Sequence, residues 1–600
     1  MLRAAVLSAL AQGIQAESPM ATNAAVAHFD PVLRVLSRLK LSACLSRAER
    51  ETARTETRHV LGLAYLYAAK GRADADPDDV EAVEAERRAL GPAPELPRAA
   101  SFLTLAACLL LAVGLASAFV AARWLRPFDP TQTREGKILG DALARVVVSA
   151  GADAASTDVL SSARERVTSR AARATLGDPA VDEITKIIAA AERLAKLSSG
   201  AEALAELHAF QRHTAGLTRA LAARGAPYFV DANALFAEDG ARPLLMSYYI
   251  ERETEVEAEG RRARVVFLWR LDPLRVRYAA LGYTRPRTPA ALVLYDQLEM
   301  DLVRHVLPAI PEGESIDLVD EQTRILREPW ALEIESSAAS VVRADLVGQP
   351  SEVVTAAVRV GQLLARRRAL IRAWAPRLRG QGYELRVPER LIPEADYASE
   401  LELRITRREL GEWDDVHDEL RRELDEFEKL RDVFVASIER HEIQHRFDFG
   451  RGLVPVPELV CKILGHENPL DAPEESLPAR VRDELSAYLA AMARPGGLPR
   501  VDLVLLARFV LDRQSLGGAY SYTALAALRG LGLELGIDVD AVLGRGSIRR
   551  PAVAQLLARI LGHSSSDLRN AARQLFESAY GRAPEQPRVV RVRQNAKWRH

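Results

Sequence analysis

The sequence predicts a mainly α-helical protein with an α+β region in its middle and a single transmembrane helix. Three observations lead to this fold class. Ala, Leu and Arg dominate the 600 residues and Lys is sparse, a composition that favours long helices. Residues 99–122 carry no charge, and residues 246–271 have the composition of paired strands. A chain of this length exceeds the size of one core, so several domains are expected.

Changes in composition divide the chain into seven predicted segments. The Pro/Gly-rich stretch GPAPELP (91–97), for example, is typical of a linker that leads out of a first helical region. The predicted segments are an N-terminal helical region (1–98), the transmembrane helix (99–122), a helical stalk or bundle (123–225), an α+β region (226–345), a helical connector (346–400), a mainly helical C-terminal domain (401–582) and a basic, disordered tail (583–600).

Residues 99–122 form the predicted membrane span. At 1.5 Å per residue they extend about 36 Å, which exceeds a hydrocarbon core of about 30 Å. Arg98, Arg123 and Trp124 flank the run and suit interfacial anchoring. A helix buried in a large core is the alternative. The composition suits a high-GC bacterial genome, so the expected location is a bacterial inner membrane with one span. Flanking charges are too evenly divided to predict the orientation.

Local patterns predict the elements of the other segments. The first residues, MLRAAVLSALAQGIQA, favour an amphipathic helix over a signal peptide, because glutamines interrupt the apolar stretch. Further expected elements are a helix at 181–197, a β-hairpin of strands 246–258 and 263–271, a strand at 315–321, and a helix at 353–379 that ends near Gly380.

Charge and cysteine content exclude some classes of function. The formal net charge is −1, so the chain as a whole shows no electrostatic signature of nucleic-acid binding. Three cysteines cannot form a disulfide framework. We also find no internal repeat and no Gly-rich phosphate loop. The predicted partners are therefore a membrane and a substrate, and not a nucleic acid.

The motif HEIQH at 441–445 is the strongest sign of chemistry. Histidines four residues apart lie on one helix face, so both imidazoles can reach a single Zn²⁺ at about 2.0–2.1 Å. A Glu after the first His can act as general base beside a metal-bound water. Placing 11 His and at most 82 Glu at random in 600 positions gives this motif roughly 3% of the time. We predict His441 and His445 as ligands and Glu442 as the base.

The residues upstream of this motif show the periodicity of one long amphipathic helix. Continued, the periodicity places His441 and His445 on the buried stripe, with Glu442 at its edge and Arg440 and Gln444 facing solvent. Buried histidines need partners, which a metal provides, although hydrogen bonds within the core are the alternative. The apolar positions of the stripe are Val416, Leu420, Leu424, Phe427, Leu430, Phe434 and Ile438.

A catalytic zinc site needs a third protein ligand and an open fourth position. Glu484 is the leading candidate, because PARVRDELSAYLAAMAR predicts a helix with Glu484 on its apolar face. Pairing of Glu484 with a neighbouring arginine is the alternative. Asp448 and His466 are rival ligands. For Asp448 we prefer a role as acceptor for a ligand histidine N–H.

HEIQH followed by Glu484 on a second helix resembles the gluzincin group of zinc metallopeptidases. The resemblance covers about 50 residues and implies a zincin-like fold for 401–582. It also implies Zn²⁺ held by His441, His445 and Glu484, with Glu442 as base. Two departures are visible: Arg451 stands where metzincins have a third His, and Tyr488 stands where gluzincins often have an Asp. No specific family is matched, so no substrate can be carried over.

The predicted function is a membrane-anchored zinc metallopeptidase, a hydrolase acting on a peptide or protein substrate through a zinc-activated water. Tyr488 and the segment GGAYSY (517–522) are candidates for stabilising the oxyanion, although tyrosines also serve as packing residues. The turn GYTRPR (282–287) either lines a cleft or lies at the surface. The alternatives are a non-catalytic, membrane-tethered interaction protein with a degenerate or structural zinc site, and a zinc hydrolase acting on a non-peptide amide.

Overall fold

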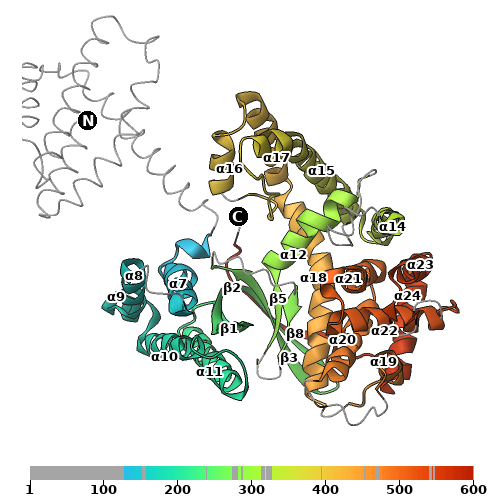
Figure 1. Cartoon of the computed structure of the whole chain (residues 1–600), viewed down its shortest axis with the longest axis horizontal. Helices are drawn as coiled ribbons and strands as arrows, with labels where there is room; N and C mark the ends of the chain where they lie inside the picture. Colours follow the sequence, from blue (N-terminus) through green and yellow to red (C-terminus); the bar gives the residue numbers. More distant parts are fainter. Residues whose placement is uncertain are drawn as a thin grey trace, which may run out of the picture. The chain divides into compact units, whose positions relative to one another are not determined.

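The computed structural model describes residues 128–598 (Figure 1). Short gaps in this range fall at 152–156, 238–239, 273–280, 286–287, 289, 312–315, 317, 319–327, 347, 394, 452–453, 467–472, 474–475, 540–542 and 545–546. The described residues belong to one compact unit, Pro127–His600. The α+β region and the C-terminal domain predicted from the sequence lie in this same unit.

The predicted transmembrane helix must be corrected. Its residues, 99–122, and the N-terminal helical region, 1–98, lie outside the described part of the chain. Among the residues that are described, no helix is both long enough and apolar enough to cross a bilayer. A long uncharged run is shared by membrane spans and buried helices, so composition alone did not separate them. The structure supports neither the membrane span nor the membrane location, and the fold is a helical protein built on a mixed β-sheet.

The predicted hairpin forms the centre of this sheet. β2 (Gly240–Ala258) pairs antiparallel with β3 (Arg261–Arg270). The two residues between them, Glu259 and Gly260, have φ of 51° and 74°. Positive φ at both positions is the geometry of the tight turn that suits the twist of paired strands.

Four further strands complete the sheet, whose order is β1-β2-β3-β5-β4, with β8 also on β2. β1 (Tyr228–Ala237) pairs with the first half of β2, and β8 (Arg588–Gln594) pairs with its second half. β5 (Ala291–Leu294) is parallel to β3. β4 (Gly282–Tyr283) pairs antiparallel with β5 and forms an edge. The predicted strand at 315–321 lies largely outside the described residues.

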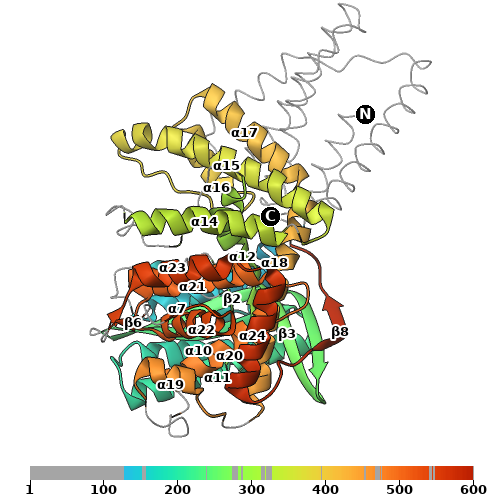
Figure 2. The same ribbon diagram turned by 90° about the vertical axis from the view of Figure 1, so that its right-hand side faces the viewer.

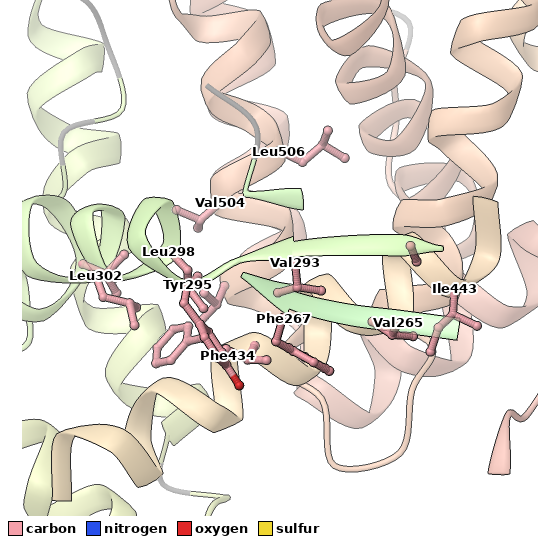
Figure 3. Close-up of a cluster of buried hydrophobic side chains, with 14 of the residues drawn as sticks. Val265, Phe267, Val293, Tyr295, Leu298, Leu302, Phe434, Ile443, Val504 and Leu506 are labelled. Carbon is pink, nitrogen blue, oxygen red and sulfur yellow. The ribbon is translucent and has the colours of Figure 1, made fainter. Parts of the chain in front are cut away.

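Alternating side chains of the sheet enter two cores, because successive residues of a strand face opposite sides. Val265, Phe267 and Val293 join the main core, where they meet Phe434 and Ile443 of α18 (Leu424–Phe449) (Figure 3). The side chains of the other face form a smaller core, which includes Tyr248, Ile250, Val266, Leu268 and Leu292. The sheet therefore supplies a rigid support for the helix that carries the HExxH motif.

Helices precede the sheet in the chain. α10 and α11 pack on each other, α11 packs on β1, and α7 packs on β2 (Figure 1). The helices here are α6 (Arg134–Gly136), α7 (Ala144–Val148), α8 (Thr157–Thr168), α9 (Arg170–Leu176), α10 (Asp178–Leu194) and α11 (Ala201–Ala223).

The helices that follow the sheet include a layer that projects away from it (Figures 1 and 2). This layer has its own aromatic core, in which Trp413 contacts Trp374 and Tyr397. The helices between β5 and α18 are α12 (Tyr295–Asp301), α14 (Pro329–Leu346), α15 (Ser351–Gly380), α16 (Ala395–Glu402) and α17 (Arg407–Arg422).

The long helix predicted from Val416 to His445 is two helices. α17 ends at Arg422 and α18 begins at Leu424, with Glu423 between them in a non-helical conformation. The Glu423 carboxylate pairs with Arg359 of α15 at 2.8 Å. The remaining helices pack around α18 and each other: α19 (Glu458–Leu464), α20 (Leu477–Met492), α21 (Pro499–Leu511), α22 (Ala519–Glu534), α23 (Arg550–Leu561) and α24 (Ser565–Tyr580).

The tail predicted to be disordered (583–600) is an ordered part of the fold over its described residues, 583–598, which corrects that prediction. Residues 588–594 form β8 on β2, and Trp598 is buried against Trp269. Glu585 has no exposed side-chain surface, and its carboxylate binds Arg261, Arg451 and Arg582. Arg261 and Arg451 lie 324 and 134 residues before Glu585, so no local sequence pattern predicts these two contacts.

Candidate metal centre

The HExxH residues lie in the C-terminal half of α18, where the helix packs on β3 and β5. Ile443 and Phe447 face that sheet and are 2% exposed. His441 and His445 are buried, as predicted, and their Nε2 atoms lie 3.1 Å apart. Packing of the helix on the sheet therefore fixes both imidazoles with their outer nitrogens converging on one point.

Glu484 reaches the same point from α20. Ser476 caps the helix and accepts from the backbone N–H of Ala479, while Val481 and Leu485 bury its inner face. Glu484 Oε2 lies 3.4 Å from His441 Nε2 and 3.7 Å from His445 Nε2. The structure thus brings together the three side chains predicted as zinc ligands, and this cluster has the composition to hold a metal ion.

The separations of these atoms fit a tetrahedral zinc ion. Ligand atoms at about 2.0–2.1 Å from a tetrahedral ion lie roughly 3.3 Å from one another. The three observed separations are 3.1, 3.4 and 3.7 Å. Glu484 Oε2 is buried, and its polar neighbours in the described part of the chain are the two imidazoles at 3.4 and 3.7 Å. A buried carboxylate oxygen needs a partner, and either an imidazole N–H or a metal ion would supply it.

The charges in the cluster stabilise one another strongly. Burial disfavours the charged form of His445, but the carboxylates of Glu484 and Glu442 outweigh it and raise the pKa of the imidazole to about 9. Burial also opposes ionisation of Glu484, yet the two histidines hold the pKa of its carboxyl well below the usual range. Glu484 is therefore an anion, as a metal ligand must be, whereas His445 would have to release its proton to bind a metal.

Glu442 lies beside the candidate ligands and is held by Thr284, the residue that follows the edge strand β4. Thr284 Oγ1 donates to Glu442 Oε2 at 2.7 Å. Gly282 makes this approach possible, because a Cβ there would lie 2.8 Å from Glu442 Oε1 and 2.7 Å from the Leu292 carbonyl oxygen. Burial raises the pKa of Glu442, against the effect of the neighbouring histidines. A raised pKa suits a general base that must also release its proton.

A cavity of about 320 Å³ runs along α18 past these residues. Ser437, His441, His445 and Phe449 line it at intervals of one helical turn, over about 18 Å. An extended peptide of about five residues spans this length. The other walls are formed by 281–284 and by residues of α12, α20, α21 and α22, among them Asp301, Arg480, Asp483, Ala491, Asp502, Leu505, Arg508 and Phe509.

Two tyrosines lie in the cavity wall near the ligands. The ring of Tyr488 packs edge-on against His441, with centroids 4.5 Å apart. Tyr520, from the predicted segment 517–522, stacks on Phe509 at 4.8 Å and is 36% exposed. Burial raises the pKa of Tyr488, and the charge of Glu484 raises that of Tyr520. Both hydroxyls therefore keep their protons at neutral pH and can donate hydrogen bonds.

Asp448 has a different role from the one predicted. Its Oδ2 accepts from Ser486 Oγ at 2.7 Å, and its Oδ1 accepts from Gln444 and Arg582. None of its hydrogen bonds among the described residues goes to a histidine. Because Ser486 follows Glu484 by two residues, Asp448 ties α18 to α20 beside the cluster. His466, the other rival, does not belong to the metal-binding cluster found among the described residues.

Arg440 and Gln444 are buried, contrary to the prediction that they face solvent. Arg440 donates to Gln444 Oε1 at 2.9 Å and to the Glu585 carbonyl oxygen at 2.8 Å. The C-terminal segment covers this side of α18, so both sides of the helix are buried. The apolar periodicity identifies one buried face of the helix, and it cannot reveal a second buried face that carries polar residues.

Sequence reasoning named the turn 282–287 as a candidate for a cleft wall but missed the contact of Thr284 with Glu442, and it missed Asp502. Thr284 lies 158 residues before Glu442, and no motif links them. The turn 282–287 lines the cavity through Gly282, Tyr283 and Thr284, whereas Arg285 pairs with Asp231. Asp502 could have been found by the argument that identified Glu484, because it too is an acid on the apolar face of a helix.

Asp502 gives a prediction about stability. Burial raises its pKa to about 7, against the opposing hydrogen bond from Ser437 and the charge of Arg494. The folded state holds this proton more tightly than the unfolded chain, whose Asp pKa is about 3.9. The resulting stability is complete below about pH 4 and is lost as the pH rises through about 7. We expect Asp502→Asn to gain about 2–4 kcal/mol over wild type between pH 4 and pH 8.

Urea unfolding of the full chain at both pH values measures this gain. Asp415→Asn, on the exposed face of α17, is the matched control and should follow wild type. The same pH dependence in wild type and Asp502→Asn would contradict the prediction.

No family model matches the sequence, and neither the curated proteins nor the solved structures compared with it include a match. The class of site therefore has to be judged from its own geometry. That geometry is a set of two histidines and a glutamate on two packed helices, with a buried glutamate at its side and a cavity in front.

Proposed function

We propose that the chain is a zinc-dependent metallopeptidase that hydrolyses peptide bonds in a peptide or protein substrate. One observation carries the proposal: His441, His445 and Glu484 converge at ligand spacing, directly beside Glu442, in the wall of a cavity. Three protein ligands leave a fourth position, which is the arrangement of catalytic rather than structural zinc sites.

The residues of the site would divide the reaction among them. Zinc bound by the three ligands would act as a Lewis acid and lower the pKa of a water to about 7. Glu442, held by Thr284, would take a proton from the attacking water. The water oxygen bonds to the scissile carbonyl carbon, the C–N bond breaks, and Glu442 passes the proton to the leaving nitrogen. Tyr488 or Tyr520 would donate a hydrogen bond to the developing oxyanion.

The position of Glu442 favours catalysis over a purely structural metal site. A structural site needs no acid beside its ligands, and burying one costs free energy. Here Glu442 is 3% exposed, and Gly282 of β4 and Thr284, just after this strand, accommodate it. An interaction protein with a degenerate site, the alternative function, would have no use for this arrangement.

The proposal can be tested with the zinc-loaded full chain and a proteome-derived peptide library, with cleavage products identified by mass spectrometry. We expect cleavage that a chelator abolishes and that added zinc restores. Stable zinc binding without cleavage of any peptide would contradict the peptidase proposal and favour the non-catalytic alternative.

A further inference from the structure

The end of the cavity next to Ser437 contains an acid for which the proposed reaction has no use. Asp502, on α21, lines the cavity and is 8% exposed. Its Oδ1 accepts from Ser437 Oγ at 2.6 Å. Its Oδ2 is buried and has no hydrogen-bond partner in the described part of the chain. An acceptor of this kind costs stability, so its retention in a cavity wall points to a ligand that donates to it.

Among the described residues that line this end of the cavity, no opposite charge balances Asp502. Asp301 and Arg508 also line it, but they pair with each other at 2.9 Å and cancel. Arg494 acts on Asp502 electrostatically, yet it does not line the cavity and it also stabilises the buried carboxylate of Glu439. Above about pH 7, where the Asp502 carboxyl is ionised, a ligand entering this end therefore meets a negative charge that no described lining cation balances.

The walls before Asp502 are apolar. Ile438, Leu505 and Ala491 line the cavity together with the ring of Phe509. Such walls suit an aliphatic chain that carries a charged group at its far end. Ser437 precedes His441 by one helical turn, about 6 Å along the axis. A long side chain of a residue at the metal centre is therefore within reach of Asp502.

We propose that this end of the cavity is a specificity subsite that binds the ammonium group of a substrate lysine through Asp502. The Ser437 hydroxyl already donates to Oδ1 of Asp502, so a single carboxylate oxygen, Oδ2, remains to accept from the ligand. One oxygen suits the point charge of an ammonium, whereas a guanidinium gains most from binding both oxygens of a carboxylate. The subsite rests on the proposed function, because it selects the residue placed next to the scissile bond.

The test uses hydroxamates, which bind zinc and hold a side chain beside it. Nα-acetyl-lysine hydroxamate and Nα-acetyl-norleucine hydroxamate share an aliphatic chain, and only the first has a side-chain ammonium. Isothermal titration calorimetry on the zinc-loaded full chain gives both dissociation constants without requiring catalysis. We expect the lysine compound to bind about 10–100-fold more tightly, as a charge-assisted hydrogen bond at a buried site implies. The arginine analogue should gain less.

The variant Asp502→Asn should reduce the preference for lysine to about twofold or less, and the exposed control Asp415→Asn should keep it. Equal binding of the two compounds to wild type would overturn the subsite and leave the zinc site standing. An unchanged preference in Asp502→Asn would overturn the role of Asp502. If neither compound binds, the zinc site and the subsite both fail. The wild-type comparison needs no variant, so it decides the matter even where a substitution impairs folding.

Discussion

Replacement of Glu442 by Gln is expected to lower kcat/KM for peptide hydrolysis by about 10²–10⁴-fold, with zinc retained. The amide keeps the size of the side chain and can still accept from Thr284, which donates to Glu442 at 2.7 Å. It cannot take a proton from water. Because Glu442 is not one of the three converging ligands, metal content should not change. Steady-state kinetics and metal analysis of the same preparation measure both effects.

Thr284→Val provides a graded comparison for this prediction. Valine removes the hydroxyl that orients Glu442 but leaves the carboxylate, so a fall of about tenfold in kcat is expected, equivalent to one ordinary hydrogen bond. Wild-type activity in Glu442→Gln would remove its role as base. Loss of zinc in that variant would instead assign Glu442 to the metal.

Replacement of Glu585 by Gln is expected to lower the free energy of unfolding by about 2–4 kcal/mol. The Glu585 carboxylate is fully buried and binds Arg261, Arg451 and Arg582. Without its charge, three cations from separate parts of the chain face one another with reduced compensation. The arginine side chains are 20–27% exposed, so solvent screens part of the loss.

Urea unfolding of the full chain measures this effect, and the exposed Glu577→Gln on α24 is the matched control. A change within about 0.5 kcal/mol of the control would show that the C-terminal segment is not held by its charge cluster. The same experiment tests the correction made to the tail, since a disordered tail would make both variants equivalent.

The parts of the site that could be predicted from the sequence are those whose residue pattern lies within a single helix. His441 and His445 follow the phase of the upstream apolar residues, and Glu484 is an acid on an otherwise apolar face. Each of these signals lies within one or two turns of a helix. The helix break at Glu423 escaped detection, because the apolar periodicity continues through it.

The parts that could not be predicted depend on contacts between distant segments. Thr284 approaches Glu442 because β4 lies at an edge of the sheet beside α18, and only the assembled sheet places it there. β8 was missed for a related reason: all seven of its residues are exposed, so it lacks the alternation that marks a half-buried strand. Its partner strand and Glu585 hold it in place instead.

The same contacts decide how the protein should be studied. Residues 401–582 carry the ligands but lack both Thr284 and Glu585. Arg440 and Gln444 would lose the segment that covers them. Experiments on the metal centre therefore call for the full chain.

The most direct test of the central claim is the zinc content of the purified full chain, measured by mass spectrometry for wild type, His441→Ala, His445→Ala and Glu484→Ala. His563→Ala, outside the cavity and the ligand cluster, is the control. We predict one zinc per chain in wild type and control, and a small fraction of that in each of the three ligand variants. Absence of zinc from wild type, or equal zinc in all five proteins, would contradict the assignment of the metal centre.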